Sequence, residues 1–112
     1  MQLDSSSLDV LIERFQEIRE FTQNGRREFR NDRKTQDAVL CNLLLIAEAS
    51  SGISEALESS GSSEDWQESY NRIDKVGHDY FNKDLDLIWE VVENHLSPLE
   101  DVIHRLRSRI GS

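Results

Sequence analysis

The stretch that decides the fold runs from Trp66 to Pro98 and reads WQESYNRIDKVGHDYFNKDLDLIWEVVENHLSP. Its first half places apolar side chains at helical spacing, at Trp66, Tyr70 and Ile73. Its second half repeats that spacing with Leu85, Ile88, Trp89, Val92 and Leu96. Such stripes are typical of helices that bury one face. The stretch therefore predicts two helices. The first begins at about Glu64 and ends at Gly77, because glycine adopts the left-handed conformation that closes helices.

Helical spacing continues on both sides of this stretch. A first helix, entered from the serines at 5–7, is indicated by Leu8, Leu11, Ile12, Phe15 and Ile18. A second helix is expected from about Thr35 to Leu57, followed by a serine–glycine loop at 59–63. The capping box at 97–100, with Pro98 at its first helical position, predicts a fifth helix carried by Leu99, Val102, Ile103, Leu106 and Ile110. No segment alternates with period two, so we expect an all-α bundle of about five helices in one domain, 1–112.

The middle of the second expected helix, AVLCNLLLIAEA at 38–49, is apolar nearly all round. A helix with this pattern is buried on more than one side. One small domain can hardly cover every side of it, and two-fold dimers are the commonest oligomers. We therefore expect a homodimer with this helix at or near the interface. Cys41, inside the apolar run, is expected to be a small buried hydrophobe rather than a nucleophile.

Composition narrows the class of protein. A net charge of −9 over 112 residues argues against a general nucleic-acid binder, which needs a basic face. The basic residues are nevertheless clustered, and each cluster is either solvated surface or a nucleic-acid patch. One cluster is Arg26, Arg27, Arg30, Arg33 and Lys34, and the other is Arg105, Arg107 and Arg109. A single cysteine, no visible secretory signal and no apolar run long enough to span a bilayer suggest a soluble cytoplasmic protein.

Three residues of the opening stretch suit phosphodiester chemistry. Arg72 can bind phosphate oxygens through its planar fork, and His78 can give or take a proton near neutral pH. Tyr80 adds a phenol two residues further on. If the helix ends at Gly77, His78 lies in a turn and can fold back toward Arg72. No Cys or His spacing suggests zinc and no glycine-rich phosphate loop is present, so we expect neither a metal nor a cofactor.

Each of these residues also has a plain structural interpretation. Arg72 could be a surface charge paired with Glu68 one turn back, and His78 could cap the end of a helix. Tyr80 and Phe81 could be core aromatics, Phe81 more readily than Tyr80. Trp66 and Trp89, at helical spacing, are expected in the core.

The same stretch resembles the HepT branch of the HEPN ribonucleases, which are the toxin halves of bacterial and archaeal toxin–antitoxin pairs. Trp66 corresponds to the tryptophan that opens the family's third helix. The element His78-Asp79-Tyr80-Phe81 matches the family's His-any-Tyr-Phe pattern, and the segment 85–99 resembles its closing pattern. The segment 29–49 is similar to the family's second helix, which packs against its partner in a homodimer.

The resemblance implies a function. It suggests a metal-independent endoribonuclease in which Arg72 and His78 act at a cleft between two protomers, with the ribose 2′-hydroxyl as the nucleophile. The implied partner is a nucleotidyltransferase antitoxin of the MNT type, which transfers AMP to a tyrosine, here Tyr80. The implied substrate is RNA, and no cofactor is involved.

The chain departs from the family pattern at one position. The commonest register has arginine at position 73 and asparagine after it, whereas this chain has Ile73 and Asp74, with Arg72 one residue early. One step along a helix turns a side chain by about 100°. Asp74 could take over the polar role of the asparagine. The alternative function is a non-catalytic, HEPN-like helical binding module that scaffolds a nucleotidyltransferase.

Overall fold

The computed structural model describes residues 4–59 and 65–110, and every regular element within these ranges is a helix. The helices are α1 (Ser5–Phe21), α2 (Arg26–Asn31), α3 (Arg33–Gly52), α4 (Ser54–Ser59), α5 (Asp65–His78), α6 (Leu85–Asn94) and α7 (Leu96–Ile110). The predicted all-α class is confirmed, and the five expected helices correspond to α1, α3, α5, α6 and α7. Of the loop expected at 59–63, Ser59 is instead the last residue of α4, and residues 60–63 lie outside the described residues, as does Glu64. None of the described helices is long and apolar enough to cross a membrane.

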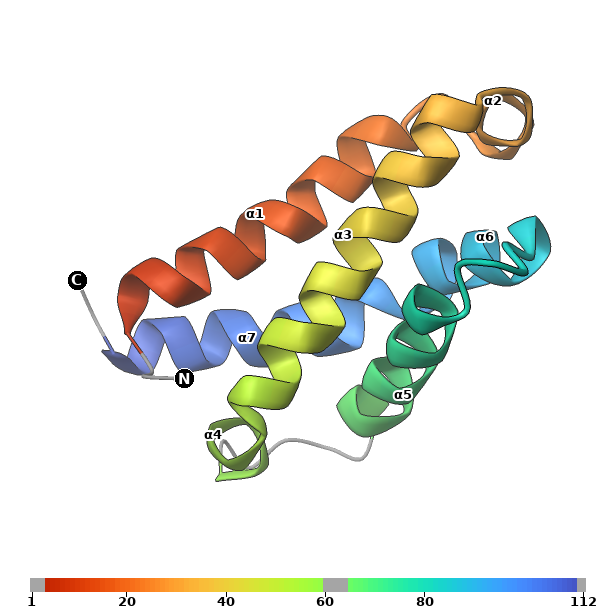
Figure 1. Cartoon of the computed structure of the whole chain (residues 1–112). Coiled ribbons are helices and arrows are strands. Elements are labelled where there is room, and N and C mark those ends of the chain that lie inside the picture. The colour runs from red at the N-terminus through yellow and green to blue at the C-terminus, as the bar shows by residue number, and fades with distance from the viewer. Residues whose placement is uncertain (1–3, 60–64, 111–112) are drawn as a thin grey trace.

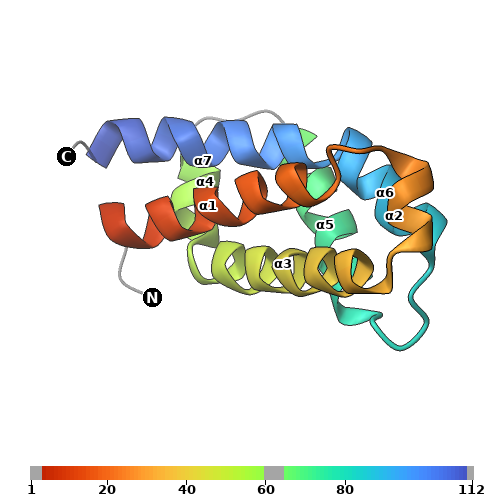
Figure 2. The same ribbon diagram turned by 90° about the horizontal axis from the view of Figure 1, so that it is seen from above.

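Four long helices form the body of the molecule (Figure 1). The helix α1 packs against α3 and α7, and α5 packs against the same two helices from the other side. The shorter α2 and α6 lie together at one end, and α4 turns under the far end of α3 (Figure 2). The result is an elongated bundle of 40 × 24 × 21 Å. Its core is formed by the inward stripes that the sequence predicted, among them Leu8, Phe15, Leu43, Ile73, Ile88 and Leu99.

Several helix boundaries differ from the prediction, and side-chain caps decide two of them, the starts of α1 and α3. The carboxylate of Asp4, not a serine, caps α1 by accepting from the Ser7 amide at 2.8 Å. Asp32 caps α3 by accepting from the Lys34 and Thr35 amides. The single helix expected to reach Leu57 breaks after Gly52 into α3 and α4. The helix α7 begins at Leu96, so the predicted capping box lies inside its first turn.

Gly77 does not end α5, and that prediction is wrong. The helix continues through His78. A Cβ at Gly77 would lie 3.0 Å from both the Cα and the amide nitrogen of Leu44, so glycine here permits close approach of α5 to α3. The chain turns only afterwards, through Asp79 to Lys83, where Lys83 takes a φ of 40°.

Two predictions about burial are confirmed and two are wrong. Trp66 and Trp89 lie in the core, and Trp89 packs on Phe29 with ring centroids 5.5 Å apart. Cys41 is exposed, because it lies on the side of α3 that the other helices leave uncovered. Phe81 is 89% exposed, because it lies in the turn after α5 rather than on a helical stripe.

Candidate active site

His78 is the last residue of α5, and both of its ring nitrogens face oxygen atoms. Nδ1 lies 3.0 Å from the backbone carbonyl oxygen of Asp74 and 3.0 Å from its carboxylate. Nε2 lies 3.3 Å from the carboxylate of Glu48, which reaches across from α3. The side chain is 51% exposed. The imidazole is therefore oriented from two helices and still open to solvent.

This environment favours the protonated imidazole. The hydrogen bond to the Asp74 carbonyl is the largest influence that raises the pKa of His78 above its ordinary value. Partial desolvation acts the other way, and the carboxylates of Asp74 and Glu48 raise the pKa again through their charges. His78 thus does more than close the helix, because it is held as a proton donor at the surface.

Arg72 lies elsewhere on α5. Its guanidinium binds Glu68 one turn back at 3.3 Å and Glu90 of α6 at 3.6 Å. Residues six apart on an unbroken helix are rotated by about 120°, and α5 is unbroken between Arg72 and His78. One protomer therefore does not bring the two side chains together, contrary to the expected turn at Gly77. The interpretation of Arg72 as a partner of Glu68 is confirmed.

Tyr80 is 51% exposed, so it is not a core ring. Its ring lies against that of Phe81, with centroids 4.5 Å apart and planes 36° apart. It also borders an open hollow of about 380 Å³, which is lined as well by Asp37, Leu40, Cys41, Leu44 and Gly77. The phenol is therefore accessible beside the outward face of α3.

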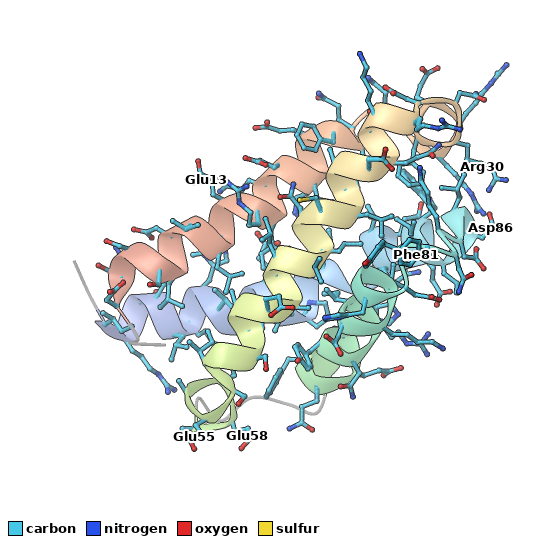
Figure 3. All side chains as sticks on the ribbon, in the orientation of Figure 1. Glu13, Arg30, Glu55, Glu58, Phe81 and Asp86 are labelled. Atoms are coloured by element: carbon cyan, nitrogen blue, oxygen red, sulfur yellow. The ribbon has the colours of Figure 1, made fainter. Side chains whose placement is uncertain are left out.

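Two arginines of the first basic cluster form ion pairs that join α2 to α6. Arg26 of α2 binds the carboxylate of Asp86 in the first turn of α6 at 2.7 Å. Arg30, which lies beside Asp86 in Figure 3, binds the same carboxylate at 2.5 Å. The hydrogen bond from Arg26 is the largest influence that lowers the pKa of Asp86. In the second cluster, Arg107 binds Asp9 of α1 at 2.7 Å.

Glu48 is a site residue that the sequence interpretation missed. Its signal was present, because it is the one acidic residue in the apolar run at 38–49. Across the residues that the structure describes, no three His, Cys, Asp or Glu side chains come close enough to hold a metal ion.

Comparison with known proteins identifies the family of the chain. The family model described as "Ribonuclease HepT-like" matches residues 11–106, which include the whole of α3 and α5 and most of α1 and α7. The chain belongs to the HepT-like ribonuclease family. The resemblance inferred from the opening stretch is confirmed by this match.

Two curated relatives carry names of the same kind. A Thermococcus cleftensis protein named "Probable ribonuclease HepT" is 32% identical over 101 residues, covering 89% of this chain and 92% of the relative. A Methanocaldococcus jannaschii protein named "Putative RNase MJ0127" is 30% identical over 98 residues, covering 83% of this chain and 81% of the relative. No solved structure is significantly similar to the chain.

Proposed function

We propose that this HepT-like chain is the toxin of a HEPN–MNT type toxin–antitoxin pair and cuts RNA without a metal ion. The observation that carries the proposal is the half-exposed imidazole of His78, oriented by Asp74 and Glu48 in a ribonuclease-family chain. Because its pKa is raised, His78 donates a proton to the leaving 5′-oxygen. The ribose 2′-hydroxyl gives its proton to a water molecule and attacks the phosphorus while the bond from phosphorus to the 5′-oxygen breaks, so the products carry a cyclic phosphate and a 5′-hydroxyl.

Arg72 is proposed to stabilise the charge on the phosphate. Its two ion pairs lie at the surface, where such pairs contribute about 0–1 kcal/mol, so an RNA phosphate can replace them. Since Arg72 is turned away from its own His78, we place the complete site in a cleft between two protomers, where each arginine serves the other protomer's histidine.

Mixed dimers test this placement. Arg72→Ala and His78→Ala protomers are inactive alone, and after mixing they recover part of the activity, because one of the two sites in each mixed dimer keeps both residues. A mixture that stays inactive while forming mixed dimers contradicts a shared site. An Arg72→Ala variant that cuts RNA at the wild-type rate removes Arg72 from the mechanism.

The outward face of α3 supports a homodimer. Cys41 and Leu45 are exposed on it, and Leu45 borders an apolar hollow of about 500 Å³ that also includes Val10 of α1. Glu48 lies on the same exposed side of α3, next to His78. A two-fold axis near this face would bring two His78 side chains toward one cleft.

Tyr80 is proposed as the control point, modified by AMP transfer from the nucleotidyltransferase antitoxin. Its phenol is accessible, and it lies two residues after His78. An attached phosphate would compete for the arginine that binds RNA, and the nucleoside would occupy space at the cleft. Co-expression with the antitoxin should increase the intact mass of the wild type and of Tyr70→Phe by the mass of one or more AMP groups. The mass of Tyr80→Phe should not change. A shift that persists in Tyr80→Phe assigns the modification to another residue.

The second candidate is a binding module that scaffolds a nucleotidyltransferase without cutting RNA. The direction of Arg72 favours it, as does Ile73, which is fully buried where the family pattern has arginine. A gel assay on total RNA with EDTA separates the two. The ribonuclease cuts RNA, spares DNA and depends on His78, whereas the binding module leaves RNA intact.

A further inference from the structure

Besides the hollow next to Tyr80, another hollow lies along the seam between α3 and α5, toward α4. It has a volume of about 350 Å³ and is lined by serines of α3 and α4 together with Glu58, Trp66, Gln67, Tyr70 and Asn71. Ser50 on its wall is 1% exposed, and its hydroxyl has no hydrogen-bond partner. A buried hydroxyl without a partner is unfavourable, and this one belongs to a residue on the wall of the hollow.

The lining identifies the kind of ligand. Tyr70 is half-buried and offers a ring on which a planar group can stack. The amides of Gln67 and Asn71 can donate and accept at one edge of a base, which is how such side chains recognise adenine. Glu58 is a carboxylate and accepts from an amino group. None of the described residues on the wall is a lysine or arginine, so the hollow suits an uncharged base and not a phosphate.

The hollow shares one side of α5 with His78. Asn71 and His78 are seven residues apart, which places them on nearly the same face of a helix and about 10 Å apart along its axis. Ser50 and Ser51 of α3 border the hollow, and Glu48 of α3 contacts His78, so the same two helices border both. An RNA strand lying along this seam can present its phosphate to His78 and a neighbouring base to the hollow.

We infer that this hollow is a base-recognition subsite that selects an unpaired base with an exocyclic amino group, such as adenine, next to the phosphate to be cut. The inference rests on the proposed ribonuclease function and adds a sequence preference to it. Glu58 and Asn71 read the amino edge of the base, and Tyr70 stacks on its ring. Uracil is disfavoured because it presents a carbonyl oxygen, not an amino group, to the Glu58 carboxylate.

Binding can be measured without cleavage. The probes are 2′-O-methyl trinucleotides of adenosine and of uridine, which lack the nucleophile, and free 5′-AMP. Calorimetry gives the affinities of the full-length protein, and NMR follows the side-chain amides of Asn71 and Gln67. The variants are Glu58→Gln and Asn71→Ala. Glu55→Gln is the matched control, because Glu55 is an exposed carboxylate on the same short helix that does not line the hollow (Figure 3).

The adenosine trinucleotide should bind at least about fivefold more tightly than the uridine trinucleotide. Glu58→Gln and Asn71→Ala should remove that preference, and Glu55→Gln should keep it. Equal affinity for the two trinucleotides, or equal behaviour of Glu55→Gln and Glu58→Gln, would overturn the subsite. Free AMP binding as tightly as the trinucleotide would overturn the RNA assignment in favour of a free nucleotide. If the preference is found but no RNA is cut, the subsite stands and the ribonuclease proposal fails.

Discussion

At the scale of single residues, the contacts of His78 and the absence of a side chain at Gly77 determine the geometry of the candidate site. His78 is held between an oxygen of its own helix and a carboxylate of α3, and Gly77 beside it lets the two helices approach. The geometry at His78 therefore depends on the absence of a side chain at the preceding position. The contacts of His78 and the close approach at Gly77 can each be tested by mutation.

The first prediction concerns the pKa of His78. NMR titration should place it above the ordinary value of about 6.5. Glu48→Gln should lower it, because the negative charge beside the imidazole is lost, while the Asp74 carbonyl keeps part of the shift. Glu13→Gln, an exposed carboxylate on α1 (Figure 3), should leave it unchanged. An identical pKa in wild type and Glu48→Gln would remove Glu48 from the site.

The same shift predicts a pH dependence of stability. A raised folded pKa stabilises the protein below the unfolded pKa, and this contribution is lost as pH rises through the folded pKa. The free energy of unfolding should therefore decline as pH rises above the unfolded pKa of about 6.5 and through the higher folded pKa, and His78→Gln should flatten this decline. Urea titrations at several pH values measure both. Parallel curves for the two proteins would contradict the contacts at His78.

Gly77→Ala is expected to destabilise the protein by about 1–3 kcal/mol, because its methyl group meets the Leu44 backbone, which cannot move aside alone. The better helix propensity of alanine offsets only part of this loss. Lys75→Ala, at an exposed position of the same helix, is the control. Chemical denaturation decides the question, and a Gly77→Ala protein as stable as Lys75→Ala would show that α5 and α3 are not tightly packed there.

At the scale of elements, the short helix α2 is attached to the bundle differently from the long helices. The six-residue α2 buries only Phe29 of its own residues, and its ion pairs with Asp86 add to its attachment to α6. Asp86→Asn should increase amide exchange in α2 more than in α1, whereas Glu93→Gln, elsewhere on α6, should not. Equal amide exchange in α2 for Asp86→Asn and Glu93→Gln would show that the ion pairs do not hold α2 against α6.

The sequence predicted the helices that carry a long periodic stripe, but it missed α2 and did not separate α4 from α3. The helices α1, α3, α5, α6 and α7 carry several buried apolar residues each, whereas α2 and α4 carry one each, Phe29 and Leu57. Gly77 was misinterpreted because a helix end and a close helix crossing both favour glycine. The partners of His78 could be predicted only on its own helix, since Glu48 depends on how α3 crosses α5.

At the scale of the whole molecule, the uncovered face of α3 requires a partner in this account. Light scattering should show a dimer at micromolar concentration, and Leu45→Glu should shift it to monomer by placing a charge in the apolar face. Leu87→Glu is the matched control, since Leu87 is 41% exposed on α6 and Leu45 is 45% exposed on α3. A monomeric wild type, or a dimer that withstands Leu45→Glu, would contradict this interface.

The most direct test of the central claim is the cleavage rate of one defined single-stranded RNA, measured in EDTA. The comparison is between wild type, His78→Ala and the matched control His104→Ala. His104 lies on α7, and its side chain is 50% exposed, against 51% for His78. Wild type and His104→Ala should cut the RNA to cyclic-phosphate products and leave its 2′-O-methyl analogue intact. His78→Ala should be slower by a factor of about 100 or more. A His78→Ala protein that cuts as fast as His104→Ala would show that His78 is not the catalytic acid.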